Sequence, residues 1–176
     1  TLGPVYGKQW RDFNGVDQIK NLVYSINTNP DSRRLMVSAW APHELDEMAL
    51  PPCHYAFQVY INNGVMDLMW QQRSADVFLG LPYDITMYGL LLEMLAKGAG
   101  LKAGQLIGQL GDCHLYNNHL EQAKEYRDRP RRAMPQLELE SGIYFEDFLY
   151  IPEKDQIKLN NYNPYSAIKA ELSVGK

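Results

Sequence analysis

The stretch that decides the fold is residues 53–72, which read CHYAFQVYINNGVMDLMWQQ. Its first half alternates with a period of two, so one face of a strand carries Tyr55, Phe57, Val59 and Ile61 and the other carries His54, Ala56, Gln58 and Tyr60. Asn62-Asn63-Gly64 is typical of a hairpin turn, and residues 65–72 then return as the partner strand. The stretch therefore predicts two antiparallel strands joined by a tight turn.

Helices and further strands are expected on both sides of this hairpin. We predict helices over residues 16–26, 84–97 and 118–127, strands over 35–40, 106–110, 137–139 and 157–160, and a helical turn over 43–48. Leu81-Pro82 precedes the second helix, and Gly98 and Gly100 end it. No internal repeat or Pro/Ser-rich linker divides the chain. We therefore expect a single α+β domain over residues 1–176, built around one sizeable sheet.

Composition argues against several classes of protein. The 176 residues are 45% hydrophobic and 22% charged, which is ordinary for a globular domain. The formal net charge of −4 disfavours a general nucleic-acid binder, and no apolar run is long enough for a membrane span. Cys53 and Cys113 are the only cysteines, so free thiols in the cytoplasm are the simpler interpretation. The first residues hold neither a signal peptide nor an initiator Met, so we expect the chain to begin inside a longer protein.

Common catalytic motifs are missing. The sequence has no phosphate-binding Gly-x-x-x-x-Gly-Lys-Ser/Thr loop and no Gly-x-Gly-x-x-Gly fingerprint. It has no His-Glu-x-x-His or Cys-x-x-Cys pair, so we predict no metal site. A Gly-x-Ser-x-Gly elbow is also missing. Standard hydrolases, ATPases and nicotinamide enzymes are therefore unsupported.

Two segments near the predicted strands carry anion-binding and nucleophilic groups. Arg33 and Arg34 could grip a phosphate through charge-assisted hydrogen bonds, although an arginine pair alone is also typical of a solvated turn. Cys53 follows two prolines, which fix its place, and a neighbouring His or Arg would favour its thiolate. A buried structural cysteine is the alternative for that residue.

Two later segments add polar groups at strand ends. Residues 71–84 read QQRSADVFLGLPYD, where Arg, Ser, Gln and two Asp follow an apolar strand and Asp84 also suits a helix N-cap. Residues 111–116 read GDCHLY. His114 and Tyr116 are two apart, so in an extended chain they point the same way and could bind one sugar hydroxyl. Satisfied structural hydrogen bonds are the alternative for both.

Together and in this order, these segments resemble the thymidylate synthase family. The resemblance rests on LGPVYGKQWR at residues 2–11, VDQI at 16–19, DSRR and VSAW at 31–34 and 37–40, LPPCH at 50–54, QRSADVFLGLP at 72–82 and DCHLYNNH at 112–119. It extends from residue 2 to about residue 174. The family fold it implies is a large mixed twisted sheet packed with helices, homodimeric through the sheet. The chain would be the catalytic domain without its N-terminal portion.

The resemblance also implies a reaction and its residues. Cys53 would add to C6 of a pyrimidine deoxynucleotide monophosphate, so that C5 can take one carbon from the co-substrate 5,10-methylenetetrahydrofolate. Implied catalytic residues are Tyr6, Cys53, His54 and Asp84. Implied nucleotide-binding residues are Arg33, Arg34, Arg73, Ser74, Ala75, Asp76, Asp84, His114, Leu115 and Tyr116. Implied folate-binding residues are Leu50, Asp76, Leu79, Gly80, Tyr83 and Ser173. Arg33 and Arg34 would reach the partner's site in an obligate homodimer.

Two departures from the family pattern leave alternatives open. The family's N-terminal region supplies a further arginine loop, a glutamate and a tryptophan, so the chain alone is expected to be poorly active. Asp84 stands where thymidylate synthases carry Asn. An ionised Asp only accepts hydrogen bonds, which favours the amino group of cytosine and suggests a dCMP hydroxymethylase. A protonated, buried Asp could still donate one bond to uracil. A non-catalytic nucleotide- or RNA-binding paralogue is the third alternative.

Overall fold

The computed structural model of the chain describes residues 2–140 and 156–173. Its helices are α1 (Gly7–Arg11), α2 (Gln18–Thr28), α3 (Leu81–Gly98) and α4 (Leu120–Asp128), with short 3-10 turns η1 (Leu45–Glu47) and η2 (Asn117–His119). Its strands are β1 (Met36–Ser38), β2 (His54–Asn62), β3 (Val65–Asp76), β4 (Lys102–His114), β5 (Gln136–Leu139) and β6 (Ile157–Asn160). The architecture is α+β, as predicted. The single domain over residues 1–176 stays a prediction, and residues 1, 141–155 and 174–176 lie outside the described residues.

The predicted hairpin forms the centre of a four-stranded sheet with the order β1-β2-β3-β4. Strands β2 and β3 pair antiparallel from His54↔Gln72 to Asn62↔Val65, which confirms the turn. A register shift between His54 and Ala56 leaves Tyr55 without a partner residue in this ladder. Tyr55 is consequently 37% exposed, whereas Phe57 is fully buried. The prediction of a regular alternation that places Tyr55 and Phe57 on one face was therefore wrong for Tyr55.

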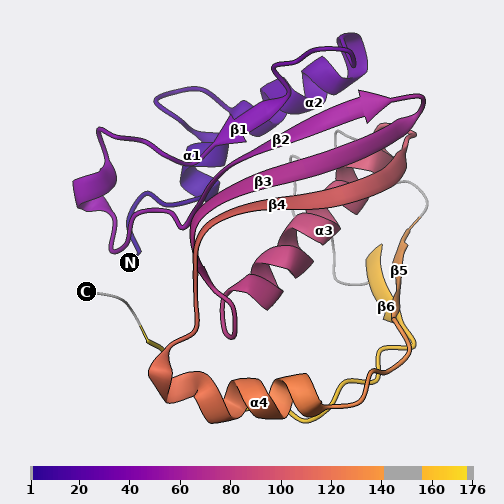
Figure 1. The fold of residues 1–176 in the computed structure, drawn as a ribbon. Helices are drawn as coiled ribbons and strands as arrows, with labels where there is room; N and C mark the ends of the chain where they lie inside the picture. Colours follow the sequence, from indigo (N-terminus) through magenta and orange to yellow (C-terminus); the bar gives the residue numbers. More distant parts are fainter. Residues whose placement is uncertain (1, 141–155, 174–176) are drawn as a thin grey trace.

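Strand β4 pairs parallel to β3, and α3 makes the crossover between them (Figure 1). This pairing makes the sheet mixed. Strand β4 is longer than the five residues predicted, since it follows β3 from Val65↔Lys102 to Asp76↔His114. Glycines interrupt the hydrophobic pattern beyond both ends of the predicted strand, at Gly104 and Gly111. At Gly111, a Cβ would lie 2.8 Å from the Arg73 carbonyl oxygen, so the sheet needs glycine where the pattern needs an apolar side chain.

Helix α3 begins earlier than its pattern suggested. Its N-cap is Gly80, and Pro82 lies in the first turn, where a missing N–H costs nothing. Asp84 therefore lies inside the first turn of α3, and the alternative that it is the N-cap is wrong. Leu92 and Leu95 of α3, with Ile19 and Leu22 of α2, pack against the sheet in one core cluster.

The last two strands do not join the large sheet. Strands β5 and β6 pair antiparallel as a separate two-stranded sheet, so the one sizeable sheet that was expected consists of β1 to β4. Each strand is only four residues long, so its sequence pattern is too short to indicate which strand it pairs with. Figure 1 shows α4 and this small sheet set apart from the main sheet. Among the described residues, no helix has the length and apolar character needed to cross a membrane.

Candidate active site

The strand register gathers the polar segments at one end of the main sheet. Because β3 and β4 are parallel, Ser74 pairs with Asp112 and Asp76 with His114. Strand β2 is antiparallel to β3 and therefore begins at the same end. The Arg73 N–H donates to the Cys53 carbonyl at 2.8 Å, which ties the start of β2 to β3. Residues distant in sequence consequently meet around Cys53.

Cys53 lies between two cavities that share Ser74, His114 and Tyr116. The first, of about 300 Å³, is lined by Tyr6, Cys53, His54, Gln72, Ser74, Asp76, Leu79, Gly80, Asp84, His114, Tyr116, Leu172 and Ser173. The second, of about 500 Å³, is lined by Leu50, Cys53, Arg73, Ser74, Asp112, His114, Leu115, Tyr116 and Asn117. We call them the base cavity and the phosphate cavity, after the nucleotide groups that the resemblance in the sequence implies for their residues. Concave sites with converging polar groups of this kind are typical of ligand binding.

Tyr6 lies against Cys53 and His54, at the start of β2. The Cys53 N–H donates to its hydroxyl at 3.1 Å, and its ring stacks on the His54 imidazole with centroids 4.2 Å apart. The Tyr6 backbone has φ 35°, in the left-handed region that a tyrosine seldom adopts. Such strain costs on the order of 1–3 kcal/mol and is found mostly at functional sites. Burial, the largest effect, raises the pKa of Tyr6, so the hydroxyl stays protonated.

His54 lies in a chain of buried polar side chains behind Tyr6. Its Nδ1 is 2.8 Å from the Tyr88 hydroxyl, and its Nε2 is 3.7 Å from Asp84 Oδ1. Burial lowers the pKa of His54, and the nearby Asp84 charge only partly offsets this. The imidazole is therefore neutral at pH 7, and its contact with Asp84 is not an ion pair. Burial also raises the pKa of Tyr88.

Asp84 is held from the core side by Gln72. Gln72 Nε2 donates to Asp84 Oδ2 at 2.8 Å and to the Ser74 carbonyl at 3.0 Å. Gln72 is only 3% exposed, and its Oε1 accepts from Trp70 Nε1 at 3.0 Å. A fixed indole N–H thus decides which end of the Gln72 amide faces Asp84.

Arg73 stabilises the turn that precedes Cys53. Its Nε donates to the Pro52 carbonyl at 3.0 Å and its Nη2 to the Pro51 carbonyl at 2.8 Å. The guanidinium lies 5.9 Å from the centre of the Trp40 ring, within reach of a cation–π contact. These contacts hold a positive charge at the edge of the phosphate cavity beside Cys53.

Comparison with known proteins agrees with this arrangement. The family model described as "Thymidylate synthase" matches residues 1–174. The chain belongs to the thymidylate synthase family. It is 46% identical to "Thymidylate synthase" of Mycoplasma pneumoniae over 99% of this chain and 59% of that protein. It is 49% identical to "Probable thymidylate synthase" of Escherichia phage T5 over 98% of this chain and 63% of that protein.

A solved structure of a thymidylate synthase is also similar to the chain. The crystal structure of thymidylate synthase from T4 phage matches with a TM-score of 0.87 at 43% identity, over 98% of this chain and 64% of that one. The chain therefore spans about three fifths of the length of the relatives it matches.

Most residues that the thymidylate synthase resemblance singled out lie around these two cavities. They are Tyr6, Leu50, Cys53, His54, Arg73, Ser74, Asp76, Leu79, Gly80, Asp84, His114, Leu115, Tyr116 and Ser173. Asp76 has a structural part in this, because its Oδ1 accepts from the N–H groups of Phe78 and Leu79 and so shapes the turn into α3.

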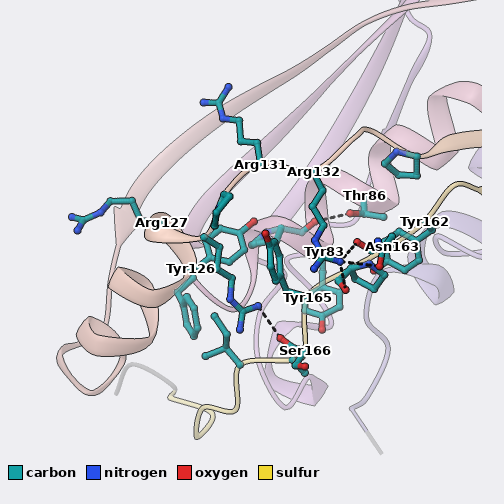
Figure 2. Close-up of a pocket in the computed structure, with 18 of the residues that line it drawn as sticks. Tyr83, Thr86, Tyr126, Arg127, Arg131, Arg132, Tyr162, Asn163, Tyr165 and Ser166 are labelled. Atoms are coloured by element: carbon teal, nitrogen blue, oxygen red, sulfur yellow. Dashed lines mark hydrogen bonds between the residues drawn. The ribbon is translucent and has the colours of Figure 1, made fainter.

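Four predicted thymidylate synthase residues lie elsewhere. Ala75 is fully buried in β3 and lines neither cavity, because alternate residues of a strand face opposite sides. Arg33 and Arg34 are exposed on the turn between α2 and β1 and reach neither cavity of their own chain. Tyr83 is 76% exposed and lines a third cavity of about 760 Å³ (Figure 2).

Four arginines and four tyrosines line that third cavity. Two of the arginines donate hydrogen bonds to backbone carbonyls, and the other two point away from the cavity. Arg132 Nη1 donates to the carbonyls of Asn163 and Pro164, and its guanidinium lies 3.7 Å from the centre of the Tyr165 ring. Arg129 donates to the Ser166 carbonyl. Figure 2 shows Arg127 and Arg131 pointing away from the cavity. Arg129 and Arg132 thus hold the segment around Tyr165 in place.

Sequence reasoning missed Gln72, Tyr88 and Leu172. Gln72 had a detectable signal, since it follows Leu68 and Trp70 on the buried face of β3, where an unexplained polar residue is rare. Tyr88 is hidden among the apolar residues of α3, and Leu172 comes from a segment without regular structure. Among the residues that the structure describes, no group of His, Cys, Asp and Glu could hold a metal ion.

Proposed function

We propose that the protein is a thymidylate synthase that converts dUMP to dTMP with 5,10-methylenetetrahydrofolate as the one-carbon donor. The observation that carries this proposal is the position of Cys53 between the phosphate cavity, with Arg73, and the base cavity, with Asp84. A nucleotide bound across both would place its pyrimidine ring at the Cys53 sulfur.

In this proposal, Arg73 and Ser74 bind the phosphate, while His114 and Tyr116 bind the ribose hydroxyl. The rings of His114 and Tyr116 lie edge to face with centroids 5.0 Å apart, so both can reach one hydroxyl group. Fixing the phosphate and sugar holds C6 of the base against the sulfur, which supplies proximity. Leu115 and Asp76 complete the nucleotide contacts.

Cys53 then adds to C6 as a thiolate, and C5 becomes nucleophilic enough to form a bond to carbon. C5 attacks the folate methylene, the C5 hydrogen is then lost as a proton, and the folate amine leaves to give an exocyclic methylene at C5. Hydride from the tetrahydrofolate, which is thereby oxidised to dihydrofolate, completes the methyl group. Tyr6 and the neutral His54 belong to the polar network that moves protons around the base. Expulsion of the thiolate finally restores the ring and frees Cys53.

The base cavity fits a reduced folate beside the nucleotide. Leu79, Gly80 and Leu172 give an apolar wall for a flat ring. Asp76 keeps Oδ1 on the backbone, so Oδ2 is the acceptor for the pterin N–H groups. Leu50, Tyr83 and Ser173 would extend this contact.

We also propose that the cytoplasmic protein acts as an obligate homodimer through the open face of the sheet, with Arg33 and Arg34 reaching the partner's phosphate site. Their exposure on the α2–β1 turn supports this, because they serve neither cavity of their own chain. A subunit mixture tests it. Cys53→Ala and Arg34→Ala proteins, each with little activity, should recover activity when mixed and refolded, since one mixed site is intact. No recovery would count against shared sites.

One observation favours a second candidate, dCMP hydroxymethylation. Gln72 donates to Asp84, which holds the carboxylate as an acceptor. An acceptor suits the amino group of cytosine better than O4 of uracil. A mismatch at such a buried site can discriminate by about four powers of ten.

The deciding experiment incubates the purified protein in its natural full length with 5,10-methylenetetrahydrofolate and either dUMP or dCMP. Mass spectrometry then identifies the product. Methylated dUMP supports the main proposal, and hydroxymethylated dCMP overturns it in favour of the second. Cys53→Ala should abolish either reaction, with Cys113→Ala as the matched control. A protein that binds nucleotide equally well with and without the Cys53 thiol, and turns over neither, would instead be a binding paralogue.

A further inference from the structure

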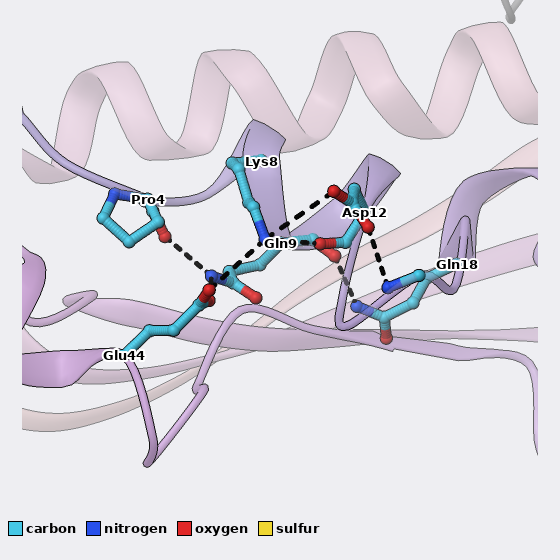
Figure 3. A network of polar contacts seen from close by, with 7 residues as sticks. Pro4, Lys8, Gln9, Asp12, Gln18 and Glu44 are labelled. Carbon is cyan, nitrogen blue, oxygen red and sulfur yellow. Dashed lines mark hydrogen bonds and ion pairs between the residues drawn. The ribbon is translucent and has the colours of Figure 1, made fainter.

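The polar network around Gln9 connects the segment that carries Tyr6 to the loop that leads to Cys53. Gln9 is fully buried in α1, and its Nε2 donates to the Pro4 carbonyl at 2.8 Å and to Glu44 Oε2 at 2.5 Å. Figure 3 shows Pro4, Gln9 and Glu44 joined in this way. One amide group thus spans the chain before Tyr6 and the turn that precedes Pro51, Pro52 and Cys53.

Further contacts anchor both sides of this bridge. Gln18 Nε2 donates to the Gln9 carbonyl at 2.8 Å and to the Ser38 carbonyl at 2.7 Å, which fastens α1 to strand β1. The Ala49 N–H donates to the Leu2 carbonyl at 3.0 Å. The chain on either side of Tyr6 is therefore held at several points, and this allows its backbone to keep a φ of 35°.

The bridge closes into a ring at the candidate nucleophile. Starting from Gln9, one path runs back along the chain to Tyr6, and the other runs through Glu44 and along the loop to Cys53. The Cys53 N–H bond to the Tyr6 hydroxyl joins the two paths. Gln9 is therefore linked to both sides of the contact between Tyr6 and Cys53, although it lines none of the three cavities described above.

The chemistry of Gln9 fits this task. Burying the Gln9 amide costs folding free energy, because its Oε1 has no hydrogen-bond partner among the described residues. Its two N–H donors are both used, each on an oxygen from a different segment. Glu44 is fixed in turn by Lys8, whose Nζ lies 3.4 Å from Glu44 Oε1.

We propose that Gln9, paired with Glu44, is the positioning residue that holds Tyr6 over Cys53. The inference rests on the proposed function only for its effect on turnover. The positioning itself can be measured without turnover, from the accessibility of the Cys53 thiol.

The test compares Gln9→Met, which keeps the length of the side chain but has no donor, with wild type and with Gln136→Met, the same change at an exposed glutamine of β5. Iodoacetamide labelling is followed by peptide mass spectrometry, with the exposed Cys113 as the reference thiol in the same molecule. We expect the Cys53-to-Cys113 labelling ratio to change several-fold in Gln9→Met and to stay unchanged in Gln136→Met. An unchanged ratio in well-folded Gln9→Met would overturn the proposal. If that variant does not fold, Glu44→Ala on the partly exposed side of the pair serves instead, with the same expectation.

Turnover of dUMP or dCMP gives a second measurement through a double-mutant cycle with Tyr6→Phe. Because small misplacements at a reacting centre are costly, Gln9→Met should lower kcat by about ten-fold or more, mainly without raising KM. If Gln9 acts through Tyr6, the same change should cost much less in the Tyr6→Phe background. Strictly additive losses would overturn the positioning role. A Tyr6→Phe protein with full activity would count against the proposed role of Tyr6 alone, and the labelling ratio would still test the positioning.

Discussion

Gln72 Nε2 lies 2.8 Å from Asp84 Oδ2, and this bond links the hydrophobic core to the base cavity. The Trp70 indole can only donate, so the Gln72 oxygen must face it and the Gln72 NH₂ must face Asp84. The orientation of the group at position 84 is therefore set from beneath by an aromatic side chain of the core. Under the proposed function, this short chain of hydrogen bonds decides which group position 84 offers to the base.

Asp84→Asn should shift base preference toward uracil. The oxygen of the substituted amide would accept from Gln72, which leaves the amide NH₂ to donate to O4 of the base. The ratio of kcat/KM for dUMP to that for dCMP should rise by about ten-fold or more. Steady-state kinetics on both nucleotides measure this ratio, and Asp46→Asn on the exposed η1 turn is the control. An unchanged ratio would mean that position 84 does not read the base.

Gln72→Leu should destabilise the fold even without ligand. The change leaves the Trp70 N–H buried without its acceptor and removes the donor from Asp84, at a cost of about 1–3 kcal/mol. Urea unfolding followed by tryptophan fluorescence should show a lower midpoint. Gln71→Leu is the matched control, because Gln71 Oε1 is buried and has no partner among the described residues. Replacing that side chain should leave stability equal or higher, and an equal loss in both variants would contradict this account.

Protonation of His54 should weaken the fold in mild acid. Burial lowers the pKa of His54 below its usual value of 6.5, so the unfolded chain binds a proton more readily than the folded one. The free energy of unfolding should therefore fall as pH drops below about 6.5, since the unfolded state takes up protons first. Urea midpoints between neutral pH and pH 5 measure the slope, and His54→Gln should reduce it. A slope that is the same in both proteins would exclude His54 as its source.

Gly108→Ala should destabilise the sheet at the β3–β4 contact. The added Cβ would lie 2.6 Å from two atoms of the Trp70 ring, so the ring or the strand must move. Overpacking of this kind costs typically about 1–3 kcal/mol. Thermal unfolding provides the measurement. Gly7→Ala is the control, because a Cβ on this helical glycine meets no atom within 4 Å, and its melting temperature should not fall.

The sequence was most informative where one local pattern determines the structure. The period-two strand with Asn62-Asn63-Gly64 located the hairpin, and motif resemblance located Cys53 and Arg73 at one site. Local patterns failed to predict the bounds of elements that depend on contacts with residues distant in sequence. The ends of β4 depend on its pairing with β3 beyond Gly104 and Gly111, and the helical start at Leu81 depends on Pro82 being tolerated in a first turn. Gln72 and Tyr88 escaped notice because their partners come from other elements.

The parallel pairing of β3 with β4 also fixes the order in which the site can assemble during synthesis. The β2–β3 hairpin can form as soon as it leaves the ribosome, with Cys53 and Arg73 already adjacent. His114 arrives only after the whole of α3 has been made and has folded back to bring β4 alongside. Until then the far side of β3 is an open strand edge that another nascent chain could occupy. The crossover that brings His114 beside Asp76 thus also moves the open edge of the sheet from β3 to β4.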